Sequence, residues 1–312
     1  MKNDFEDFYQ NLDKTEIQEQ WKIAKNKKIK RTIIALILMV VIDAPILILF
    51  KNLISNFGVL GTIFPITSCL VADVIIYVIC TMGALKGYNN IFKEKIIDQL
   101  LKNFFDEVDY IPNKGMLRET YEEGNYPGYY NRYHSDDYME GSIDNKYRMK
   151  MAEILTQHEE TTRDSDGNTR TETTTIFSGL FAKIDIGKSI NNELKIYQDK
   201  SFRKKDRLDM DSQEFEKYFD VTSTNEIVGM QLLTHDIMDL LIDFRTRIKL
   251  PFDILIRNDT MYIRLHVGPM FEGKINRKVA IDEKTVEKYF NIVDFIYSLS
   301  KMMIKVVEDT EI

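Results

Sequence analysis

Two apolar stretches near the N-terminus decide the architecture: Thr32–Phe50 reads TIIALILMVVIDAPILILF, and Val59–Leu85 reads VLGTIFPITSCLVADVIIYVICTMGAL. A membrane-spanning helix needs about 20 mostly apolar residues. The first stretch therefore fits one bilayer crossing, and the second exceeds it. Only Lys51–Gly58 separates them. The sequence predicts a transmembrane helical hairpin with spans at about residues 32–50 and 59–85.

Basic residues flank the two stretches unevenly. A cluster precedes the first stretch, consisting of Lys25, Lys27, Lys28, Lys30 and Arg31. The connecting segment holds Lys51, and several lysines follow the second stretch. Because Lys and Arg are enriched on the cytoplasmic side of short spans, we expect a multi-pass protein of the cell membrane with both termini in the cytoplasm. The cluster is also placed to contact anionic lipid head groups, so the lipid bilayer is an expected partner.

Hydrophobic periodicity after the spans indicates a mixed domain. Threonine-rich extended runs at Lys150–Thr162 and Thr169–Ile186 flank the turn Asp164–Asn168 and predict a long β-hairpin. Phe252–Ile256 and Met261–Val267 alternate apolar residues around a second turn, and helical spacing follows Thr234 and Asp282.

No strand–helix–strand repeat is present, so the fold class is α+β with antiparallel strands. The chain then divides into an acidic, then basic cytosolic segment (1–31), the transmembrane hairpin (32–87) and a soluble α+β domain (88–312).

Two acidic residues interrupt the apolar stretches, Asp43 and Asp73. A charged carboxylate at mid-bilayer costs about 2.5–3.5 kcal/mol on insertion scales. One interpretation is that these residues carry an ion or proton pathway in an oligomer. The other is structural: the acids are protonated, bonded to Thr67, Ser68 or a freed backbone carbonyl, or they contact another helix.

Composition argues against several classes of function. The formal charge of −7 and the pI of about 5.3 do not suit a general nucleic-acid-binding surface. The two cysteines lie in the second apolar stretch, and the four histidines lack the spacing of zinc ligands. No Walker loop, dinucleotide-binding glycine motif or nucleophile elbow occurs. We expect no metal, no cofactor and no catalytic residue, which leaves an enzyme the least favoured class.

Two loops could provide contact surfaces. Tyrosines cluster in the segment 113–145, either as a contact surface or in local packing: Tyr126, Tyr129, Tyr130, Tyr133 and Tyr138. A basic loop could touch anionic lipid or an acidic partner, or could simply be solvated: Arg203, Lys204, Lys205 and Arg207.

Short motifs in the second half of the chain resemble a known family. They are FSGLF at Phe177–Phe181, EFEKYFDV at Glu214–Val221, LLTHDIM at Leu232–Met238 and the pair Phe271-Glu272. Their order after two N-terminal spans is similar to the bacterial, membrane-anchored family catalogued as domain of unknown function 3137. The resemblance implies no activity and no catalytic residues, and the motif residues suit core packing.

These observations predict an integral membrane protein that acts as an interaction or scaffold module. Its cytosolic domain would bind a protein partner or a second copy of the chain. The alternative is an oligomeric ion or proton pathway that uses Asp43 and Asp73.

Overall fold

The computed structural model describes the chain except residues 1–4, 127, 164–168, 199–206, 274–277 and 311–312, and gives only the backbone of 51–62, 64 and 65. The chain forms two compact units. Unit 1 comprises Met1–Asn11, Ile96–Glu272 and Glu283–Ile312, and unit 2 comprises Leu12–Lys95 and Gly273–Asp282. The division expected at residues 31 and 87 concerns the relation of the chain to a membrane and stays a prediction.

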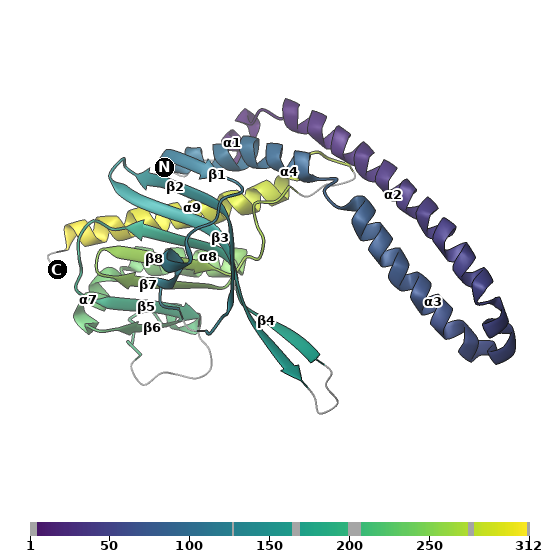
Figure 1. Cartoon of the computed structure of the whole chain (residues 1–312). Coiled ribbons are helices and arrows are strands. Elements are labelled where there is room, and N and C mark those ends of the chain that lie inside the picture. Colours follow the sequence, from purple (N-terminus) through teal and green to yellow (C-terminus); the bar gives the residue numbers. More distant parts are fainter. Residues whose placement is uncertain (1–4, 127, 164–168, 199–206, 274–277, 311–312) are drawn as a thin grey trace. The chain divides into compact units, whose positions relative to one another are not determined.

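Unit 2 is built on two long helices, α2 (Thr15–Leu49) and α3 (Lys51–Thr81), followed by α4 (Lys86–Phe92). Helices α2 and α3 run antiparallel and lie side by side (Figure 1). The expected loop Lys51–Gly58 is wrong, because α3 begins at Lys51 and only Phe50 separates the helices. Helix α3 ends at Thr81, before the predicted end at Leu85. Gly83, just beyond it, takes a positive φ of 68°, a conformation that commonly terminates helices.

Large apolar side chains of unit 2 face outward. Val40, Ile48 and Val74 are 69%, 71% and 64% exposed, whereas soluble monomers rarely expose continuous apolar patches of more than a few hundred Å². Within the described residues, α2 alone is long and apolar enough to cross a membrane, and 6% of its apolar window is buried. The stretch Ile66–Thr81 meets the same test only as a bent pair with Lys86–Phe104. One candidate span is therefore established, and the transmembrane hairpin remains a prediction.

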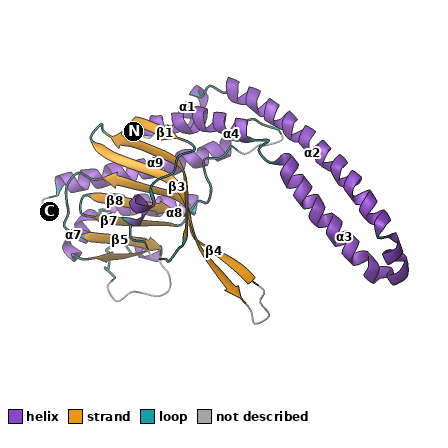
Figure 2. Ribbon diagram, in the orientation of Figure 1, coloured by secondary structure: helices purple, strands orange, loops and turns teal. Residues whose placement is uncertain are grey.

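Unit 1 contains an eight-stranded sheet in the order β1-β2-β3-β4-β8-β7-β5-β6, and every pairing is antiparallel (Figure 2). The strands are β1 (Asp106–Ile111), β2 (Arg132–Ile143), β3 (Tyr147–Arg163), β4 (Thr169–Asp185), β5 (Glu193–Gln198), β6 (Phe219–Ser223), β7 (Phe252–Arg257) and β8 (Thr260–Leu265). The α+β class is confirmed, as are the two predicted hairpins, β3–β4 and β7–β8.

Helices cover one face of this sheet: α1 (Phe5–Asn11), α5 (Asp98–Phe104), α7 (Glu226–Leu232), α8 (His235–Ile248) and α9 (Glu283–Asp309). Alternate residues of β7, such as Phe252 and Ile254, point into this layer. Phe295 of α9 stacks on Phe244 of α8 at 3.8 Å between ring centroids, and both pack against Phe252. Thr234 caps α8 as expected, by accepting a hydrogen bond from the Ile237 backbone N–H.

The segment between β1 and β2 covers part of the opposite face. It carries the short helix α6 (Arg118–Glu122), whose Tyr121 is buried against Phe177 and Phe181 of β4. Tyr138 belongs to this apolar cluster, and Tyr126, Tyr130 and Tyr133 pack against it. Local packing therefore accounts for four of the five predicted tyrosines. Tyr129, at 74% exposure, lies outside the cluster.

Strands β1 and β2 were not predicted. The segment 113–145 was expected to form a loop, but it contains α6 and β2. In β2 the register shifts between Asp136 and Met139, and Asp137 adopts a positive φ of 54°. This β-bulge breaks the alternation by which a strand is recognised in sequence. Before β6, Phe215–Lys217 forms a 3₁₀ turn.

Candidate functional site: an acidic pocket in unit 1

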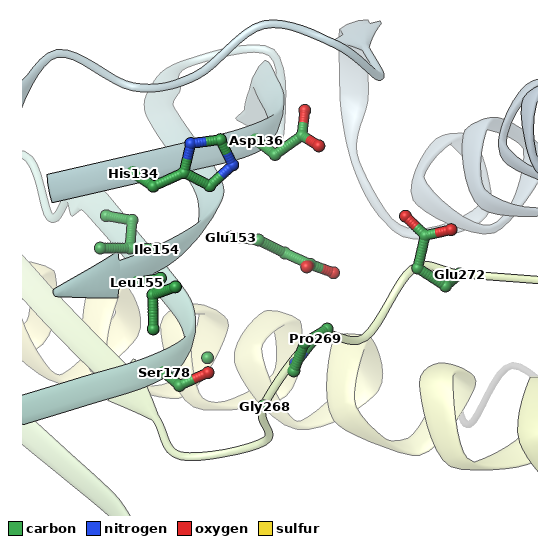
Figure 3. A pocket seen from close by; sticks show the side chains of 10 residues that line it. His134, Asp136, Glu153, Ile154, Leu155, Ser178, Gly268, Pro269 and Glu272 are labelled. Atoms are coloured by element: carbon green, nitrogen blue, oxygen red, sulfur yellow. The ribbon is translucent and has the colours of Figure 1, made fainter. Parts of the chain in front are cut away.

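A pocket of about 180 Å³ lies where three strands meet the loop after β8 (Figure 3). Strand β2 contributes His134 and Asp136, and β3 contributes Glu153, Ile154 and Leu155. The remaining wall comes from Ser178 and Gly179 of β4 and from Gly268, Pro269 and Glu272 of the loop. In β2 and β3, His134 pairs with Leu155 and Asp136 with Glu153, so strand register places these four side chains on one face.

Glu153 fixes the loop that closes the pocket. Its Oε1 accepts hydrogen bonds from the backbone N–H groups of Met270, at 2.9 Å, and Phe271, at 2.6 Å. Hydrogen bonds to a carboxylate are about twice as strong as those between neutral groups. In Figure 3 the Glu153 side chain extends from its strand toward this loop. These two hydrogen bonds, together with the one from Gly268 N to Ser178 O, hold the loop against the strands.

The chemistry of the pocket is acidic. Three of its ten lining residues are carboxylic acids, and none of the ten is Lys or Arg. Beside it, the Tyr110 hydroxyl donates to Asp137 Oδ1 at 2.5 Å. Burial raises the pKa of Tyr110 far above its usual range, and the Asp137 charge raises it further, so this phenol keeps its proton. Such a lining suits a cationic group or a donor of hydrogen bonds.

Glycine is required where β4 passes the end of β8. A Cβ on Gly179 would overlap Leu265 O and lie 2.8 Å from Val267 N. Close by, Gly268, whose N–H donates to Ser178 O, has a φ of +68°, and a Cβ added there would meet nothing within 4 Å. Gly179 thus allows a close backbone approach, and Gly268 allows a turn.

A second polar cluster lies on the sheet face opposite the helices. The Arg264 guanidinium donates to Asp253 Oδ2 from Nε at 3.1 Å and from Nη2 at 2.7 Å. It lies over the ring of Tyr126, and His266 Nε2 is 3.2 Å from the same carboxylate oxygen. Burial acts to raise the pKa of Asp253, but the His266 hydrogen bond and the Arg264 charge outweigh it and lower the pKa below its usual value.

The predicted membrane aspartates come together in unit 2. The Cys69 thiol of α3 hydrogen-bonds the Asp43 side chain of α2, and Asp73 lies close enough to interact with the same thiol. Oδ1 of each aspartate is buried and has no hydrogen-bond partner among the described residues. Two acids that are 30 positions apart in sequence therefore interact with the same thiol.

The predicted basic residues have separate environments. Lys25, Lys27, Lys28, Lys30 and Arg31 all lie on α2. Arg31 Nη1 donates to Met82 O, just after α3, at 2.6 Å. Of the predicted basic loop, Arg203, Lys204 and Lys205 lie outside the described residues. Arg207 is enclosed by carboxylates, with Nη2 2.9 Å from Glu216 and Nη1 3.2 Å from Asp220.

Sequence reasoning missed the pocket. The adjacent acids Asp136 and Asp137 were visible, but acids are common in this chain, and nothing in the sequence places them beside Glu272. The nearest signal was the pair Phe271-Glu272, which belongs to the quoted family motifs. The structure adds that Phe271 is buried, whereas Glu272 lines the pocket.

Comparison with known proteins identifies one family. Residues 175–305 match the family model described as Protein of unknown function (DUF3137). No curated protein and no solved structure matches the chain. The matched segment includes the pocket residues of β4 and the loop, together with Asp253, Arg264 and His266. Over residues 175–305, the chain is therefore similar to this family of unknown function.

Proposed function

We propose that the protein is a membrane-anchored interaction module, held by two spans and with unit 1 in the cytoplasm. The observation that carries the proposal is the exposed apolar surface of α2 and α3. A surface of this kind is stable in a bilayer and costly in water. The basic cluster on α2 favours a cytoplasmic location for both ends of the chain.

The contact between Arg31 and Met82 supports two spans rather than one. It places the start of the apolar part of α2 beside the end of α3. From Arg31 to the turn at Phe50, α2 has a length of about 30 Å, which equals the hydrocarbon thickness of a bilayer. An arginine at this position would sit at the lipid head groups, where its charge is favourable.

Unit 1 would supply the binding surface. Its acidic pocket can accept a cationic side chain of a partner, because carboxylates form charge-assisted hydrogen bonds with Lys and Arg.

A pull-down from the host membrane in mild detergent tests this proposal. We expect the full chain to retain a stoichiometric partner that is absent from a control lacking Asn113–Ile312. The double variant Asp43→Asn, Asp73→Asn should retain it, because the interaction surface lies in unit 1. Recovery of the full chain without any partner, or retention of the same partner by the shortened control, would contradict the proposal.

A second function is favoured by one observation, the pairing of Asp43, Cys69 and Asp73 between α2 and α3. Two buried carboxyl oxygens without partners could pass a proton or an ion through an oligomer. On this account, the double asparagine variant loses the cellular function although its partner is still captured. Retained function in that variant would exclude the pathway.

A further inference from the structure

Strands β3 and β4 extend beyond the rest of the sheet as a two-stranded ribbon (Figure 1). We call Gln157–Arg163 together with Thr169–Thr175 the β-arm. The two strands pair with each other along its whole length, up to Arg163 opposite Thr169. Pairing of β2 with β3 ends at Gln157, and pairing of β8 with β4 ends at Leu180. The outer part of the β-arm therefore has no neighbouring strand among the described residues.

The β-arm has almost no packing to hold it. From Glu160 to Arg163 and from Thr169 to Thr175, every residue is exposed. Two-stranded ribbons without a covered face are marginally stable in water. Yet the sequence strongly favours strand, since β4 places Thr at 169, 171, 173, 174 and 175. Strong strand propensity in a ribbon that packs so little is what we expect of a strand that another chain pairs with.

The two edges of the β-arm differ. At the base of the β3 edge, Asn131 N donates to Gln157 O, and the Asn131 side chain bonds both the N–H and the C=O of Glu159. These bonds show that the odd-numbered residues of β3 direct their backbone groups away from β4. Because Gln157 lies opposite Thr175, the odd-numbered residues of β4 direct theirs away from β3. The β4 edge thus offers a row of threonine backbone groups, at 169, 171, 173 and 175, with no blocking Lys or Pro.

We propose that a second copy of this chain pairs with the β4 edge, antiparallel and centred on Thr171. In this register Thr171 lies opposite Thr171 of the second copy, and Thr169 lies opposite Thr173. On the other face, Arg170 lies opposite Glu172, twice by symmetry. Each of these threonine pairs is a hydrogen-bonded pair, because the backbone N–H and C=O groups of both residues face the other copy. The same residues contribute from both copies, as a two-fold dimer requires.

Charge complementarity favours a second copy of the chain as the partner strand, and it favours pairing centred on Thr171. Within one chain Arg170 Nη2 lies 2.7 Å from Glu172 Oε1, and Glu172 lies directly opposite Glu160. Like charges in that position are unfavourable, and opposite charges are favourable. A second copy brings another Arg170 beside Glu172. Centring the dimer one residue later, on Glu172, would instead oppose two Glu172 side chains. The inference does not depend on the proposed membrane anchor.

Cysteine cross-linking tests the pairing at single-residue resolution. In the full chain with Cys69→Ala and Cys80→Ala, Thr171→Cys places two Cα atoms about 5.5 Å apart, within the range of a disulfide. Thr173→Cys and Thr161→Cys are matched controls, equally exposed. In this dimer the two copies of each control residue lie about 14 Å apart. We expect at least tenfold more disulfide dimer for Thr171→Cys than for either control, under mild oxidation in detergent.

Charge reversal provides an independent readout. Glu172→Arg opposes two arginines and should weaken dimerisation in sedimentation by about tenfold. The double variant Arg170→Glu, Glu172→Arg restores opposite charges and should restore the dimer. The inference is overturned by equal cross-linking at all three positions, by no cross-linking at Thr171→Cys, or by a double variant as weak as the single one.

Discussion

Alanine at Gly179 is expected to destabilise unit 1 by about 3 kcal/mol or more. The added Cβ would overlap Leu265 O and crowd Val267 N, and both are backbone atoms that cannot rotate away. Relief requires β8 to move from β4, which would break the Leu180–Leu265 pairing next to it and disturb the pocket wall. Urea unfolding of the full chain in detergent, followed by near-UV circular dichroism, measures the loss.

Gly268→Ala is the matched control in the same part of the pocket wall. Here the Cβ meets nothing within 4 Å, and only the positive φ of 68° is unfavourable. We expect a loss of about 1–2 kcal/mol. Equal losses for Gly179→Ala and Gly268→Ala would show that close approach of β8 does not constrain Gly179.

Replacement of Arg264 by leucine should cost about 3–5 kcal/mol, because it leaves the Asp253 carboxylate buried without its cation. Arg264 is 6% exposed and makes two hydrogen bonds to that carboxylate. The double variant Arg264→Leu, Asp253→Leu removes the stranded charge and should recover most of the stability. Arg247→Leu, which breaks a half-exposed pair with Asp243, should change stability by at most about 1 kcal/mol.

The effect of Arg264→Leu should depend on pH in a defined direction. The folded state lowers the pKa of Asp253, so its contribution is present above the unfolded pKa and is lost as pH falls through the folded pKa. Without Arg264, Asp253 takes up a proton at higher pH, which relieves the buried charge. The difference between wild type and variant should therefore be largest near neutral pH and shrink as pH falls through the unfolded and then the folded pKa of Asp253. A difference that grows on acidification would contradict this assignment.

Local patterns in the sequence were sufficient for much of the fold. The β7–β8 hairpin is recognisable because Ile254 and Ile263 belong to regular alternations around a turn. Helix α8 is recognisable from its cap at Thr234 and its apolar spacing. In both cases the deciding interactions lie within a few residues of each other.

The pocket and the β-arm depend on contacts that a single sequence does not encode locally. Glu153 meets the Met270 backbone across 117 positions, and no periodicity predicts such a contact. Strand β2 could not be recognised because the bulge at Asp137 interrupts its alternation of side chains. The threonine-rich hairpin was predicted, but its projection depends on where β2 and β8 end, which is a property of the whole sheet.

The central claim is that two spans place both ends of the chain on the cytoplasmic side. Single cysteines at Lys27, Lys51 and Lys217, in the Cys69→Ala, Cys80→Ala background, test it most directly with a membrane-impermeant thiol reagent on host cells. We predict labelling of Lys51→Cys in intact cells, and of Lys27→Cys and Lys217→Cys only after permeabilisation. Labelling of both Lys51→Cys and Lys217→Cys in intact cells would contradict the account, because the chain would then cross the membrane once, through α2, with unit 1 outside.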